Sequence, residues 1–138
     1  MANWNDATIQ EFHSKAGKGV GQFGDQLMLL TTVGVRSGRE RTSPVMYHRD
    51  GERFVVIASK GGAPDNPGWY NNLKAKPVAR VEVGTATGTE TFEVRARDAD
   101  GEERERMFAD RVAMAPGFGE YQQKTSRQIP VVILERTG

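Results

Sequence analysis

Apolar and polar residues alternate along several short stretches of this chain, which is the pattern of strands with one buried and one exposed face. The alternation is clear at residues 78–83 and 89–97, with a glycine-bracketed turn between them. Residues 54–59 are instead almost continuously apolar, which predicts a strand buried on both faces. Further strands are expected at residues 26–32, 42–49 and 129–134.

Other segments place apolar residues at helical spacing. Helices are expected at residues 4–16, 68–75 and 100–113, with a short helical turn at 118–125. Asp100 and Glu103 resemble a capping box at the start of the third helix, whose Glu and Arg residues are expected to face solvent. The apolar surface of that helix would consist of Met107, Val112 and Met114.

Six short strands, mostly joined as hairpins and interrupted by helices, favour a small β-barrel of the α+β class. The strands are too few and too closely linked for a doubly wound sheet. We expect an N-terminal helix and glycine-rich connector at residues 1–24. A single domain of about six mainly antiparallel strands with peripheral helices should fill residues 25–138.

Composition narrows the function classes further. A net charge of +1 over 138 residues does not suggest bulk nucleic-acid binding, and the absence of cysteine excludes disulfides and thiolate chemistry. His13 and His48 lie far apart without acidic neighbours at ligand spacing, so no metal site is expected. The sequence predicts a soluble, cytoplasmic protein that acts on a small molecule. Weak peripheral membrane contact through Trp4, Ile9 and Phe12 is an alternative.

Residues 35–42 combine three arginines, a serine and a flexible glycine between two expected strands. The planar guanidinium matches phosphate oxygens, and Gly34 and Gly38 allow backbone N–H groups to turn toward an anion. A solvent-exposed hairpin tip, kept soluble by charge, is the alternative interpretation.

Two more segments carry candidate chemistry. The third strand ends in Ser59-Lys60-Gly61-Gly62, which places a hydroxyl, a cation and unobstructed amides at one rim. Trp69 and Tyr70 could form walls for a planar ring, with the amides of Asn71 and Asn72 bonding to its carbonyls. An ordinary glycine turn and a core tryptophan are the respective alternatives.

Taken together, three segments resemble the deazaflavin-dependent nitroreductase family. They read LLTTVGVRSGRERTSPV, DGERFVVIASKGGAPDNPGWYNNLKAKP and YQQKTSRQIPVVIL, in that order. The resemblance implies a split β-barrel, akin to the FMN-binding barrel of pyridoxamine-phosphate oxidases, that binds coenzyme F420. It further implies transfer of hydride from F420H2 to quinones, activated C=C bonds or nitroaromatic compounds.

The resemblance also implies which residues bind the cofactor, in four groups. Phosphate would be held by Val35, Arg36 and Ser37. The ribityl chain and ring would lie beside Arg41, Thr42, Ser43, Pro44, Val45 and Met46. The third strand would contribute Ile57, Ala58, Ser59 and Lys60. The short helix would contribute Gly68, Trp69, Tyr70, Asn71 and Asn72, with Phe118 added from the later helical turn.

One stretch departs from the family pattern, in which tyrosines cluster before the last strand. Here Tyr121 matches, Phe118 lacks the hydroxyl and Ala115 lacks the ring. Cofactor binding is still expected, but nitroimidazole activation is not. Tyr121 and then Ser59 are the candidate proton donors, with bulk water as a third source.

Two alternative functions and the oligomeric state remain open. FMN could replace F420 in a related barrel reductase or oxidase, or the protein could carry F420 without catalysis. The chain could be a monomer or a homodimer.

Overall fold

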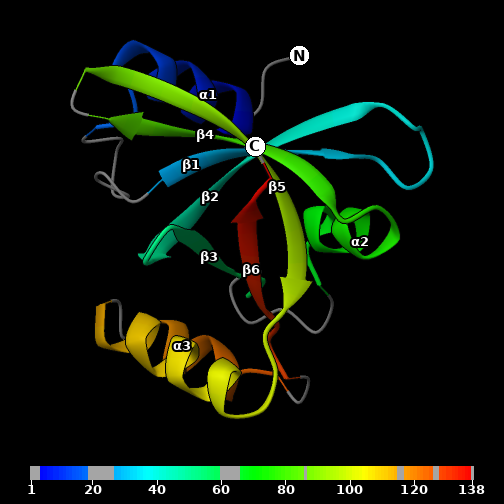
Figure 1. Cartoon of the computed structure of the whole chain (residues 1–138), viewed down its shortest axis with the longest axis vertical. Coiled ribbons are helices and arrows are strands. Elements are labelled where there is room, and N and C mark those ends of the chain that lie inside the picture. Colours follow the sequence, from blue (N-terminus) through cyan, green and yellow to red (C-terminus); the bar gives the residue numbers. More distant parts are fainter. Residues whose placement is uncertain are drawn as a thin grey trace.

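The computed structural model describes residues 4–18, 27–59, 66–85, 87–114, 117–125 and 128–137. Six antiparallel strands form a closed barrel in the order β1-β2-β3-β6-β5-β4 (Figure 1). The strands are β1 (Leu27–Val33), β2 (Glu40–Asp50), β3 (Arg53–Ile57), β4 (Val78–Thr85), β5 (Gly88–Asp98) and β6 (Val131–Arg136). The predicted six-stranded barrel is therefore confirmed, with each strand within a few residues of its expected place.

The helices lie outside the barrel, and α1 and α3 lie on different sides of it (Figure 1). They are α1 (Trp4–Ser14), α2 (Gly68–Ala75), α3 (Gly101–Met114) and α4 (Gly117–Gln123). The expected helix at 68–75 matches α2 at both ends. The glycine-rich connector falls mostly outside the described residues. Within the described part of the chain, no helix is long and apolar enough to cross a membrane.

Strand β3 separates two apolar clusters, because its alternate residues point to opposite faces. Phe54 and Val56 belong to the barrel interior, whereas Val55 and Ile57 belong to a cluster outside the barrel that α3 and α4 cover. All four are at most 8% exposed. The prediction of a strand buried on both faces is confirmed.

Helix α1 packs against the outer face of β1. Phe12 is fully buried in a small cluster with Leu27 and Leu29. A Cβ atom on Gly84 of β4 would lie 2.7 Å from the carbonyl oxygen of Ala16, so this glycine allows the chain after α1 to approach the barrel closely. The suggested contact of Phe12 with lipid is wrong, because the helix uses this side chain to bind the barrel.

The prediction for α3 needs a correction. Arg104 and Arg111 are 6% and 1% exposed, whereas Met114 is 51% exposed. Positions 104, 107 and 111 share one helical face, and that face packs inward around the buried Met107. The two arginines bury their long aliphatic stems there while their guanidinium groups reach polar partners.

The expected capping box at α3 takes another form. The carboxylate of Glu103 accepts hydrogen bonds from Arg97 of β5 at 2.9 Å and from Arg53 of β3 at 3.4 Å. These contacts, led by the hydrogen bond from Arg97, hold the pKa of Glu103 below its usual value. Glu103 therefore fastens α3 to the barrel.

Candidate functional site

The cationic segment forms a tight turn between β1 and β2. The Gly34 N–H donates to the Arg39 carbonyl at 2.8 Å, and the Gly38 N–H donates to the Gly34 carbonyl at 3.0 Å. Gly38 has a φ of +69°, a conformation that side chains disfavour. The Ser37 hydroxyl accepts from the Arg39 N–H at 3.1 Å, so it shapes the turn from within.

This turn presents unpaired positive charge. Arg36, Arg39 and Arg41 are exposed, and within the described part of the chain none of them forms an ion pair. Glu40, the one acidic residue of the segment, instead binds Arg80 of β4 at 2.7 Å, and this pairing lowers the pKa of Glu40. The turn therefore remains cationic, as a phosphate site requires.

Helix α2 joins the same region through Asn72. Its Oδ1 accepts from the Val35 N–H at 3.1 Å, and its Nδ2 donates to Thr32 Oγ1 at 3.0 Å. The cationic turn and α2, 37 residues apart in sequence, are thereby brought together. Asn71 and Gly68 are exposed on the same helix.

The predicted strand residues divide between the two faces of the barrel wall. Met46 and Ile57 face outward and pack with Phe118 and Tyr121 of α4. By alternation along β2, Thr42 and Pro44 share the outer face with Met46. Thr42 is exposed and Pro44 is partly exposed, so the end of this face nearest the cationic turn is the part that a flat ring could cover. Ser59 is also buried, at 8% exposure, just beyond β3.

Three other predicted residues turn into the barrel. Val45 packs against the interior cluster, Ala58 is fully buried in it, and Tyr70 is 8% exposed within it. The Tyr70 hydroxyl donates to Asp98 at 2.6 Å, and burial together with this bond raises the pKa of Tyr70. The side chains of Ala58 and Tyr70 therefore point into the core, because strand and helix periodicity turn them inward.

Trp69 keeps a partly exposed ring at the barrel edge. It packs against the interior cluster and meets Tyr70 edge-on, with the ring centroids 6.5 Å apart. Both interpretations made from the sequence therefore apply to this side chain, since it anchors α2 and still presents surface. Lys60, Gly61, Gly62 and Ala115 lie outside the described residues.

Phe118 and Tyr121 form one aromatic pair on α4. Their rings meet edge-on with centroids 5.4 Å apart. The Arg111 guanidinium lies 4.9 Å from the Phe118 ring centroid, an attractive cation–π geometry. Its Nη1 also donates to the Tyr47 carbonyl at 3.4 Å. Arg111 thus ties α3, α4 and β2 together behind the pair, a role that the sequence pattern gave no sign of.

His48 lies on β2 near Arg111 and is 6% exposed. Among the described residues, neither of its ring nitrogens has a hydrogen-bond partner. Burial, and next the positive charge of Arg111, lower the pKa of His48. The ring is thus a neutral core residue. No group of three or more potential metal ligands occurs within the described ranges.

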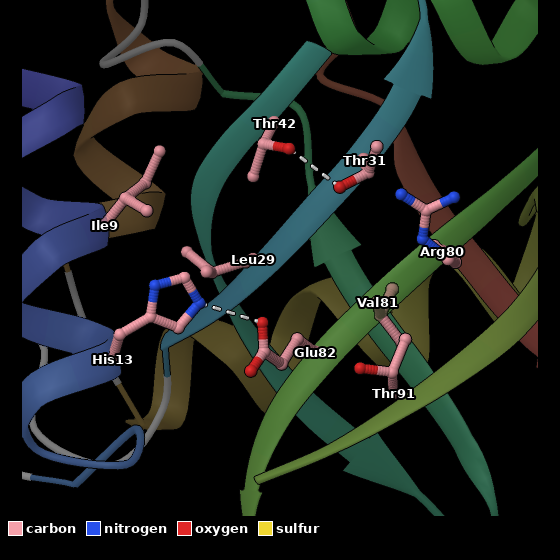
Figure 2. A pocket seen from close by; sticks show the side chains of 9 residues that line it. All are labelled: Ile9, His13, Leu29, Thr31, Thr42, Arg80, Val81, Glu82 and Thr91. Atoms are coloured by element: carbon pink, nitrogen blue, oxygen red, sulfur yellow. Dashed lines mark hydrogen bonds and ion pairs between the residues drawn. The ribbon is translucent and has the colours of Figure 1, made fainter. Parts of the chain in front are cut away.

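A separate cavity of about 260 Å³ lies between α1 and the outer face of the barrel (Figure 2). His13 binds Glu82 at 3.1 Å on one side of it, and Thr31 and Thr42 share a 2.9 Å hydroxyl bond on another. Thr42 alone belongs to the predicted cofactor set. Among the described residues that line it, His13 is paired with Glu82 and Arg80 with Glu40, so this cavity does not suit an anionic cofactor and is not the candidate site. Its lining consists of Ile9, His13, Leu29, Thr31, Thr42, Arg80, Val81, Glu82 and Thr91.

The candidate site therefore runs from the cationic turn along β2 to the apolar face under α4. The six residues from Arg41 to Met46 span roughly 17 Å of extended strand. Such a strip fits a long molecule with an anionic group at one end and a flat ring at the other. The donors at the turn fit phosphate, and the partly exposed Met46 and Tyr121 at the edge of the apolar cluster could contact the ring of a deazaflavin.

Comparisons with known proteins agree with this geometry. A family model described as F420H(2)-dependent quinone reductase matches residues 4–136. The F420H(2)-dependent quinone reductase Rv1261c of Mycobacterium tuberculosis is 39% identical over 110 residues, which cover 79% of this chain and 72% of the relative.

Solved structures give the same picture. An F420-H2 dependent reductase (FDR-A) has a TM-score of 0.71 at 40% identity, covering 80% of this chain and 94% of that one. A second structure, described as a domain-swapped dimer, has a TM-score of 0.73 at 36% identity and covers 94% and 95% of the two chains. The resemblance inferred from the sequence and the split-barrel fold are both confirmed.

Proposed function

The chain belongs to the F420H(2)-dependent quinone reductase family, and on that premise we propose that it reduces quinones and the activated C=C bonds of enones and unsaturated lactones. It is an F420-dependent oxidoreductase, with reduced F420 as the hydride donor. The finer choice of acceptor is our proposal.

The observation that supports the proposal best is the continuity of the site. A turn with three exposed arginines, which form no ion pair with any described residue, leads directly into a strand whose outer face packs under an aromatic pair. FMN, which has a phosphate but no anionic tail, would need less positive charge. A carrier would have no need of a partly exposed tyrosine beside the ring face.

In the proposed mechanism, bound F420H2 supplies a hydride to the acceptor. Arg36, Arg39 and Arg41 would hold the phosphate end, and the apolar surface around Met46 would orient the ring and exclude water. Fixing two reactants in this way lowers the barrier by up to about 7–11 kcal/mol in ideal cases.

Hydride transfer must be accompanied by a proton. In an enone or lactone the hydride goes to a carbon and the proton to the carbonyl oxygen, whereas in a quinone the second oxygen can take the hydride. Tyr121 is partly exposed on α4 beside the apolar face, and we propose its hydroxyl as the donor. Ser59, at the end of the third strand, is the second candidate. A hydroxyl near the developing oxyanion would also stabilise its charge.

The proposal is tested by titrating the protein into F420 and following the quenching of its fluorescence. Reoxidation of F420H2 is then measured with a menaquinone analogue, an α,β-unsaturated lactone and a nitroimidazole. We expect binding, turnover of the first two and little turnover of the third. Tight binding without turnover of any acceptor would support a carrier instead, and preferential turnover of the nitroimidazole would overturn the argument from Phe118.

We also propose a homodimer as the assembly, because one related structure is described as a domain-swapped dimer. Light scattering after size exclusion measures the mass directly. A mass near 15 kDa at all concentrations would show a monomer.

A further inference from the structure

We propose that Asn72 is a positioning residue, which holds the β1–β2 turn in the shape that binds phosphate. The proposal rests on the proposed function for the identity of the ligand. It starts from the two hydrogen bonds of one amide, Val35 N–H to Oδ1 at 3.1 Å and Nδ2 to Thr32 Oγ1 at 3.0 Å.

Packing of α2 against the barrel fixes the position of the Asn72 side-chain amide. Tyr70 and Leu73, on the same helix, are 8% and 3% exposed in the barrel interior, which fixes α2 against β1. Thr32 is 1% exposed, so its hydroxyl is a buried acceptor that α2 must satisfy. Asn72 therefore bonds to Thr32, which is fixed in the core, and to Val35 in the turn. The position of Thr32 thereby constrains the position of Val35.

The turn itself leaves two donors for a ligand. The N–H groups of Gly34, Val35, Gly38 and Arg39 all donate within the protein. Within the described part of the chain, the Arg36 and Ser37 N–H groups have no such partner. These two N–H groups are consecutive and lie at the exposed tip of the turn, beside the Arg36 side chain. Such an arrangement suits an anion.

The bond from Val35 to Asn72 lies next to this pair of donors. Fixing the Val35 N–H fixes the Gly34–Val35 peptide plane, so that only the φ and ψ of Val35 separate this fixed plane from the Arg36 N–H. On the other side, a Cβ atom on Gly34 would lie 2.7 Å from the Ser37 hydroxyl, so the turn is closely packed internally. Val35 and Asn72, which the sequence predicts to bind the cofactor, thus have a role in aiming Arg36 and Ser37.

The decisive variant is Thr32→Val, because a buried residue cannot contact the cofactor. Thr32→Val and Asn72→Ala should each weaken F420 binding about tenfold, the equivalent of one or two neutral hydrogen bonds. The double variant should lose little more than either single variant, since both break one chain of contacts. The KM for F420H2 should rise while kcat at saturation stays near that of the wild type.

Thr89→Val is the matched control. It also removes a threonine hydroxyl bond, the 2.9 Å bond to Glu82 on the β4–β5 hairpin, and should leave F420 affinity unchanged. Thermal unfolding of every variant confirms that the barrel is folded. Unchanged F420 affinity in a folded Thr32→Val protein would overturn the proposal.

A second measurement separates this inference from the proposed function. Hydrogen exchange at the Val35 amide, followed by NMR without any cofactor, should be faster in Thr32→Val and in Asn72→Ala than in the wild type. Failure of the wild type to bind F420 would refute the cofactor assignment but not this result. Unchanged exchange at Val35 would refute the positioning role even if F420 binds.

Discussion

At the scale of single residues, the exposed arginines of the turn carry the electrostatic part of binding. Arg36→Ala removes one charge-assisted contact, worth roughly 1.5–3 kcal/mol, so F420 affinity should fall by one to two orders of magnitude. Arg95→Ala, which removes an exposed arginine of β5, is the control. Fluorescence titration measures both, and equal affinity in the two variants would remove Arg36 from the phosphate site.

Tyr121 can be tested without disturbing its packing. Tyr121→Phe keeps the edge contact with Phe118 and removes only the hydroxyl. F420 affinity should be unchanged, whereas kcat with a menaquinone analogue should fall roughly a hundredfold if the hydroxyl delivers the proton. A variant as fast as the wild type would assign that role to Ser59 or to water.

The burial of His48 makes the stability of the fold depend on pH. Its pKa is lowered in the folded protein, so the folded state favours the neutral ring while the unfolded chain binds a proton below about pH 6.5. The unfolded state therefore holds more protons in that range, and stability is lost as the pH falls below 6.5. His48→Phe should flatten the dependence of urea unfolding on pH between 5 and 7, and an identical slope in the variant would contradict this.

At the scale of the elements, Arg104 joins α3, α4 and the chain entering β6. Its Nη2 donates to the Ile129 carbonyl at 2.7 Å and to Gln122 Oε1 at 3.2 Å. Arg104→Leu should cost about 1.5–3 kcal/mol of unfolding free energy, since it removes a buried charge-assisted bond. Arg106→Leu, an exposed neighbour, should change it by less than about 1 kcal/mol. Urea unfolding that ranks the two variants the other way would refute this role.

At the scale of the whole molecule, the cofactor should stabilise the barrel by binding only its folded form. A hundredfold excess of F420 over its Kd adds about 2.7 kcal/mol. That increase corresponds to a rise of roughly ten degrees in Tm for a domain of this size. FMN at the same concentration should give a much smaller rise, and an equal or larger one would favour the FMN alternative.

Much of this architecture could be predicted locally. Alternation at 78–83 and 89–97 marked β4 and β5, and the apolar run at 54–59 marked a strand with two buried faces. Periodicity could do this because backbone geometry alone sets which residues share a face. It failed for α3, where Arg104 and Arg111 are buried, since hydrophobicity scales treat long cationic side chains as solvent-facing.

The sequence by itself determined the barrel, the cationic turn and the family, because these depend on local pattern and on the order of motifs. Only the tertiary structure decided which predicted residues lie inside the barrel and which lie outside it. It turned Ala58 and Tyr70 into the core, kept Met46 and Ile57 outside, and joined Asn72 to a turn 37 residues away. Contacts between distant segments arise when the barrel closes, and no local pattern records them.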